Sequence, residues 1–167
     1  MREAIAKHVR DGDVVAIEGF THLICYPAAH EIIRQKRREL TLCRLTPDLV
    51  ADQMIAAGCV RKLVFSWAGN PGAGSLHAFR RAVPGLELDE YSHFGMVMRF
   101  VAGAAGLPFG ALRNYGGTSL PRANGSIREV TCPFTQETLA AVPALNPDVT
   151  IVHAQRADQD GNTQMWG

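Results

Sequence analysis

Residues 11–20 read DGDVVAIEGF, and this stretch decides the expected fold class. The turn-forming residues 11–13 are followed by a continuous apolar run at 14–17, which predicts a short strand buried on both faces. Strands of this kind are typical of parallel sheets that are covered by helices. The run ends at Gly19 and Phe20, so a tight connection is expected there.

The same alternation of strand and helix continues outward from this stretch. Further strands are expected at 40–45, 62–67, 87–91 and 149–155, with order returning at 128–134, and helices are expected before residue 11 and at 27–38, 47–57, 74–83 and 93–105. This order implies crossover connections on a parallel sheet. We therefore expect one α/β domain over residues 1–167, with 13–18, 62–67 and 149–154 among its central strands.

One long segment departs from this alternation. Residues 106–127 are rich in Gly and Pro, which predicts an extended surface loop, and loops of that length often carry function.

Composition excludes several classes of protein. Seventeen Lys and Arg against sixteen Asp and Glu give a net charge of +1, which argues against a nucleic-acid partner, and 47% hydrophobic residues argue against disorder. No apolar window is long enough for a membrane span or a signal peptide. The four cysteines are scattered and the histidines lack metal-ligand spacing, so we expect no metal, free thiols and a cytoplasmic location.

Candidate site residues gather where the first strand ends, because open α/β sheets bind ligands at the carboxyl ends of their strands. Gly19, Phe20, Thr21 and His22 are therefore candidates for contacting substrate or an oxyanion. Glu18 either caps the following helix or lies in a cleft with a raised pKa. A nucleophilic pair of Cys25 with His22 is a weaker alternative, since it needs a third orienting group.

Two further strand ends carry candidates. Glu90 and His93 bracket a strand end and a helix start, where they could form an acid–base couple or only cap the helix. Gln155 and Arg156 follow the last apolar strand, in a polar stretch that begins with His153.

A glycine-rich connection provides the last candidates. Gly69 and Asn70 open the stretch 69–75, which lies between an expected strand and an expected helix, as phosphate-binding loops do. Because its spacing does not match GxGxxG, a simple strand-to-helix turn is the competing interpretation.

Several of these stretches resemble one family. DGDVVAIEGF resembles the opening signature of family I CoA-transferases, and the segments at 31–35, 104–109, 132–137, 141–149 and 153–167 resemble the A subunit of the glutaconate CoA-transferase type. The resemblance covers most of the chain. It implies the layered αβα NagB/RpiA/CoA-transferase fold, with coenzyme A as a substrate and no permanently bound cofactor.

The resemblance also implies a reaction and a partner. CoA moves between an acyl-CoA and a carboxylic acid by way of a glutamyl-CoA thioester. The glutamate resembles one in a Ser-Glu-Asn-Gly stretch of a partner B subunit, which this chain lacks. Gly19 and Phe20 would then supply backbone donors for the thioester oxyanion.

Two departures from the family pattern leave alternatives open. Glu18 stands where the family usually has the first of two glycines, and the glycine expected between Phe20 and Pro27 is missing. A hydrolase or ring-opening enzyme with Glu18 or Glu90 as base is one alternative, and a non-catalytic subunit is another. The family's A subunit is longer, so the C-terminal part of the domain is expected to be missing, and the apolar end at Trp166 fits this.

Overall fold

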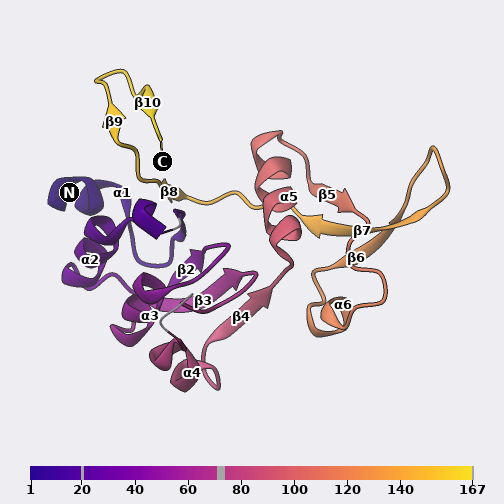
Figure 1. Cartoon of the computed structure of the whole chain (residues 1–167), viewed down its shortest axis with the longest axis horizontal. Coiled ribbons are helices and arrows are strands. Elements are labelled where there is room, and N and C mark those ends of the chain that lie inside the picture. Colours follow the sequence, from indigo (N-terminus) through magenta and orange to yellow (C-terminus); the bar gives the residue numbers. More distant parts are fainter. Residues whose placement is uncertain (20, 71–73, 167) are drawn as a thin grey trace.

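The central element of the fold is a parallel sheet. The computed structural model describes residues 1–19, 21–70 and 74–166 (Figure 1). Five strands, all parallel to their neighbours, are arranged in the order β4-β3-β2-β1-β8; they are β1 (Val14–Ile17), β2 (Leu40–Cys43), β3 (Val60–Phe65), β4 (Glu87–Glu90) and β8 (Val149–Ile151). The α/β class and the mainly parallel sheet are therefore confirmed.

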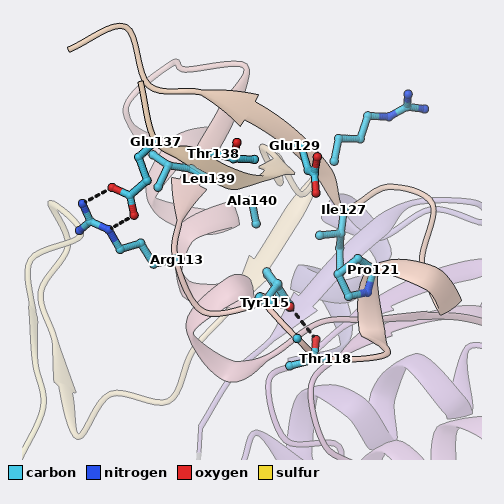
Figure 2. A pocket seen from close by; sticks show the side chains of 13 residues that line it. Arg113, Tyr115, Thr118, Pro121, Ile127, Glu129, Glu137, Thr138, Leu139 and Ala140 are labelled. Atoms are coloured by element: carbon cyan, nitrogen blue, oxygen red, sulfur yellow. Dashed lines mark hydrogen bonds and ion pairs between the residues drawn. The ribbon is translucent and has the colours of Figure 1, made fainter. Parts of the chain in front are cut away.

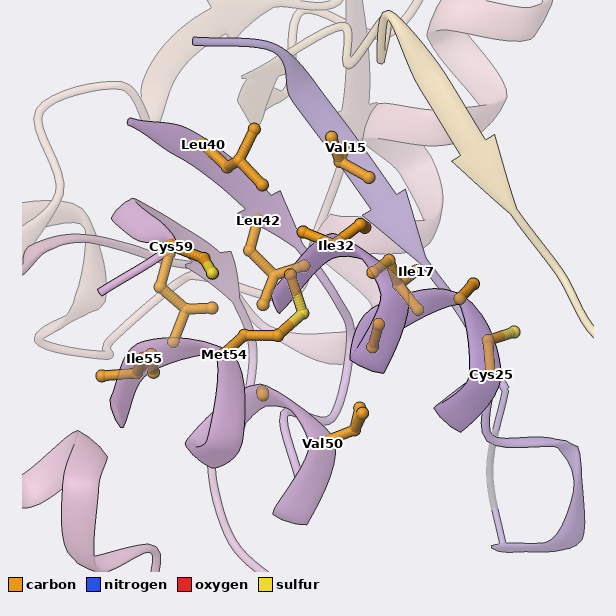
Figure 3. Packing of buried hydrophobic residues seen from close by; sticks show 14 of the residues in the cluster. Val15, Ile17, Cys25, Ile32, Leu40, Leu42, Val50, Met54, Ile55 and Cys59 are labelled. Carbon is orange, nitrogen blue, oxygen red and sulfur yellow. The ribbon is translucent and has the colours of Figure 1, made fainter. Parts of the chain in front are cut away.

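Helices cover one face of this sheet. They are α1 (Arg2–His8), α2 (Tyr26–Arg34), α3 (Leu49–Ala56) and α4 (His77–Ala82), with the short 3-10 turn η1 (Thr21–Leu23) before α2. Ile32 of α2 and Met54 of α3 pack against Ile17 and Leu42 of the strands (Figure 3). These buried side chains remove apolar surface from water, which is the main driving force for this layer.

The opposite face carries α5 (His93–Ala104), and a second sheet packs against α5. Met96 of α5 packs in one cluster with Ala16, Cys43 and Val64 of the parallel strands. Since Val15 and Ile17 face the first cluster and Ala16 faces the second, β1 is buried on both faces, as its continuous apolar run predicts.

The second sheet corrects the loop expected at 106–127. That segment contains β5 (Phe109–Leu112) and the short helix α6 (Leu120–Ala123), and β5 joins β6 (Arg128–Thr131) and β7 (Thr138–Pro143) in an antiparallel sheet of order β5-β7-β6. At Gly110, β5 lies so close to α5 that a Cβ would be 3.0 Å from the Met98 carbonyl oxygen. A glycine that permits close packing was misread as a sign of a loop.

The expected central strand at 149–154 is also corrected. β8 has three residues and lies at the edge of the sheet as described, beside β1. Beyond it the chain forms a small antiparallel hairpin from β9 (Arg156–Ala157) and β10 (Thr163–Gln164), which extends away from the sheet (Figure 1).

Candidate functional site

The carboxyl ends of the parallel strands bring polar side chains together. Glu18 and Gly19 follow β1, Thr46 follows β2, Ser66 follows β3, and His93 begins α5 just after β4. A cavity of about 320 Å³ lies at this edge, lined by Glu18, Gly19, Leu45, Thr46 and His93. The structure therefore brings three of the candidates from the sequence, Glu18, Gly19 and His93, to one place.

Arg44 connects the strand ends at this edge through hydrogen bonds. Its buried guanidinium donates to the Ile17 and Gly19 carbonyl oxygens at 2.6 and 2.8 Å, to the Thr46 carbonyl oxygen at 3.1 Å, and to the Asp48 carboxylate at 2.6 Å. Asp48 also accepts from the Val50 amide and so caps α3. A single cation thus fixes the ends of β1 and β2 relative to α3.

Glu18 is a partly buried carboxyl within the cavity. Its Oε1 accepts a hydrogen bond from the Leu45 amide at 2.9 Å. Burial raises the pKa of Glu18 above its ordinary value of 4.5, while the Leu45 amide, the Arg44 charge and the Gly19 amide act in the opposite direction. The cleft interpretation of Glu18 fits this geometry, whereas the guanidinium of Arg44 contacts Asp48 rather than Glu18.

The connection after Glu18 is a close turn. Gly19 has φ of 131°, and a Cβ there would lie 2.0 Å from the Leu23 carbonyl oxygen, so only glycine fits. Thr21 and His22 belong to η1, and Phe20 lies outside the described residues.

The pair of Cys25 with His22 is not supported by the position of the thiol. The buried Cys25 Sγ contacts the Glu18 carbonyl oxygen at 3.3 Å, and burial raises the pKa of this thiol. A thiol held in its protonated form is a poor nucleophile.

His93 is hydrogen-bonded to residues other than Glu90. Its Nε2 lies 3.0 Å from Thr46 Oγ1 and its Nδ1 lies 2.8 Å from Ser66 Oγ. Both ring nitrogens are therefore occupied, and Glu90 does not orient the imidazole. Glu90 is exposed and lines a different hollow with Lys62 and Asn124.

The remaining candidates lie elsewhere. Gly69 donates its amide to the Pro47 carbonyl oxygen, and Asn70 pairs with Gly74 across residues 71–73, which are not described. Gln155 is hydrogen-bonded to the backbone of Trp166, and Arg156 of β9 lines a separate hollow with Asp158 and Asn162. These residues do not join the cavity beside Glu18.

Sequence reasoning missed Thr46, Ser66 and Arg44 as residues of the site. The available signal was their position, since Arg44 and Ser66 are the last residues but one of expected strands and Thr46 directly follows one. Their convergence depends on β2 lying between β1 and β3.

A second cavity, of about 290 Å³, lies away from this edge, between the antiparallel sheet and α6 (Figure 2). Arg113 and Glu137 form a bidentate ion pair at its rim, with both N–O distances at 2.7 Å. We favour the cavity beside Glu18 as the functional site because it lies at the carboxyl ends of parallel strands. In the described parts of the chain, no helix is long and apolar enough to cross a membrane, and no cluster of three metal-ligating side chains occurs.

Comparison with known proteins agrees with this arrangement. Glutaconate CoA-transferase from Acidaminococcus fermentans superposes with a TM-score of 0.93 at 31% identity, over 99% of this chain and 59% of that one. A variant of the decarboxylase AibA/AibB superposes with a TM-score of 0.89 at 30% identity, over 98% of this chain and 64% of the other. Fold and cavity together define an α/β protein with a candidate ligand site at the edge of its parallel sheet.

Sequence comparison identifies the family. The Coenzyme A transferase family matches residues 1–167. The A subunit of 3-oxoadipate CoA-transferase from Pseudomonas knackmussii is 57% identical over all of this chain and 61% of its own length. The chain therefore belongs to the coenzyme A transferase family, and it spans about three fifths of the length of the A subunits of 3-oxoadipate and glutaconate CoA-transferase.

Proposed function

We propose that this chain is the A subunit of an enzyme that transfers CoA between an acyl-CoA and a carboxylic acid, acting in the cytoplasm with a B subunit. The observation that carries the proposal is the 57% identity, across the whole chain, to the A subunit of a 3-oxoadipate CoA-transferase. The same likeness leads us to propose a dicarboxylic acid of the 3-oxoadipate class as the acceptor of CoA.

In this proposal the partner's glutamate carries CoA, and this chain shapes the acyl site. Gly19 and Thr46 form the wall beside the reacting carbonyl group. The carboxyl of Glu18 must be neutral or turned aside when an oxyanion develops, since a second negative charge would oppose it. Its raised pKa supports the neutral form.

The proposal is tested with the full-length chain, purified with and without the protein encoded beside it. A panel of acyl-CoA donors is offered to 3-oxoadipate and, as a matched control, to monocarboxylates of equal length. We expect transfer to the dicarboxylate only when both proteins are present. Full turnover by the isolated chain, or no transfer with any donor, would contradict the proposal.

A second candidate is a hydrolytic, ring-opening or decarboxylating reaction in which Glu18 acts as base. It is favoured by the raised pKa of Glu18 inside the cavity and by the likeness to AibA/AibB. If Glu18 is the base, Glu18→Gln lowers kcat at least about a hundredfold with little change in KM. If the transferase proposal holds, the same variant changes KM more than kcat. A non-catalytic subunit would give no turnover in either assay.

A further inference from the structure

Ser66 fixes the direction of a hydrogen-bond chain that ends in the cavity. Its Oγ donates to the Leu45 carbonyl oxygen at 2.5 Å and lies 2.8 Å from His93 Nδ1. A serine hydroxyl has one proton, and a carbonyl oxygen can only accept. Because that proton is used on Leu45, Ser66 must accept a hydrogen bond from His93, and Nδ1 must carry a hydrogen.

This direction determines the state of the other ring nitrogen. In a neutral imidazole with a hydrogen on Nδ1, Nε2 is an acceptor. The Thr46 hydroxyl, 3.0 Å from Nε2, therefore donates to His93. The chain runs from Thr46 through His93 and Ser66 to the Leu45 carbonyl oxygen, and Thr46 presents only lone pairs to the cavity that it lines.

Protonation of His93 reverses the direction of the hydrogen bond between Thr46 and His93. An imidazolium donates from both nitrogens, so Nε2 then donates to Thr46 Oγ1 and Nδ1 still donates to Ser66. The Thr46 hydroxyl hydrogen becomes free to point into the cavity. The site therefore changes from hydrogen-bond acceptor to donor, and gains a positive charge, when His93 takes up one proton.

A carboxylate ligand needs donors and a compensating charge when it leaves water. We propose that the Thr46–His93–Ser66 chain makes this cavity a proton-coupled carboxylate site, in which a carboxylate binds together with one proton on His93. Thr46 contacts the ligand, and Ser66 is a positioning residue that acts through His93. The choice of a carboxylate rests on the proposed function, whereas the hydrogen-bond direction does not.

Other charged and titratable groups lie near the Thr46–His93–Ser66 hydrogen bonds, and their contribution to any pH dependence must be distinguished from that of His93. Glu18, after β1, lines the same cavity, while Arg44 and Asp48, at and after the end of β2, neutralise each other at 2.6 Å. From the antiparallel sheet side, the Tyr115 hydroxyl accepts from the Ser92 amide next to His93. Of these groups, Glu18 is the one that could take up a second proton when the ligand binds. The binding test is therefore made in the Glu18→Gln variant.

The hydrogen-bond direction is tested by the ring ¹⁵N chemical shifts of labelled histidine in the full-length protein, with His93 assigned by His93→Gln. We expect the neutral form of His93 to be the Nδ1–H tautomer, and Ser66→Ala to shift it toward Nε2–H. Thr46→Val, which keeps the shape but removes the hydroxyl, should leave Nδ1 protonated. An Nε2–H tautomer in the folded wild-type protein would overturn the inference whatever the enzyme's activity.

The coupling is tested by the pH dependence of adipate binding, measured by calorimetry on the full-length protein with its partner. In the Glu18→Gln background we expect Kd to rise with pH once the free protein holds His93 neutral, approaching tenfold per pH unit, the limit for one coupled proton. Adding His93→Gln or Thr46→Val should flatten this slope. A slope that survives both changes overturns the proposal, and so does binding that does not depend on pH. Absence of adipate binding at every pH would overturn the carboxylate assignment, while the tautomer measurement remains independent of it.

Discussion

Arg44 is the residue on which the geometry of the candidate site depends most. Its guanidinium is buried and contacts three backbone carbonyl groups and the buried Asp48. Breaking a buried ion pair from one side leaves an uncompensated charge, which typically costs about 3–5 kcal/mol. Arg44→Met should therefore lower the free energy of unfolding by about that amount, as measured by urea denaturation.

An exposed arginine provides the control for Arg44. Arg61 pairs with Glu87 at the surface, and exposed pairs of this kind contribute little. Arg61→Met should hardly move the urea midpoint. Equal losses for the two variants would show that Arg44 does not organise the strand ends.

Glu18 makes stability depend on pH in a definite direction. Its pKa is raised in the folded protein, chiefly by burial, so the folded state binds more protons than the unfolded state above pH 4.5. Stability of the wild-type protein must then fall as pH rises from 4.5 through the folded pKa. Glu18→Gln removes this dependence.

The measurement for Glu18 is the difference in Tm between Glu18→Gln and wild type across this pH range. We expect the Tm of Glu18→Gln to rise relative to that of wild type as pH increases. The difference should stay constant once Glu18 is ionised in both the folded and the unfolded state. A difference that moves in favour of wild type would mean that Arg44 and the amides outweigh burial.

At the level of elements, the turn from β1 into η1 requires Gly19. A Cβ at this position would lie 2.0 Å from the Leu23 carbonyl oxygen, and φ is 131°. Gly12 has φ of 87° with nothing within 4 Å, so it isolates the backbone strain alone. Gly12→Ala should cost about 1 kcal/mol, and Gly19→Ala on the order of 3 kcal/mol or more, by urea denaturation. Similar costs would mean that the turn can shift away from Leu23.

The same elements show what the sequence can and cannot predict. β1 is predictable because its four residues form one apolar run that is buried on both faces. β5 is not, because Gly110 is used for close packing against Met98 and looks like a loop residue. β8 is shorter than its apolar run because the chain leaves the sheet after Ile151.

The candidate site was predictable to the same extent. Glu18 and Gly19 were found because they directly follow the clearest strand, and His93 because it begins a helix. The partners of His93, Thr46 and Ser66, depend on strand order, which local pattern does not encode. Arg44 reaches Ile17 across 27 residues of sequence for the same reason.

At the level of the whole molecule, two layers of buried side chains place the strand ends at one edge. Helices α1 to α4 cover one face, and α5 packs on the other, with the antiparallel sheet on the far side of α5 (Figure 1). We propose that acyl-CoA binds at this edge, beside Glu18, Thr46 and His93, and not in the cavity beside Arg113.

Hydrogen–deuterium exchange of the full-length protein with its partner, with and without acyl-CoA, tests this claim most directly. We predict that acyl-CoA slows exchange of the amides that follow β1 and β2, at 18–19 and 45–46, and of those that open α5, at 93–95. Peptides covering 113–118 and 137–140, which line the other cavity, should exchange as before. Protection of those peptides, with no change at 18–19 and 45–46, would contradict the account.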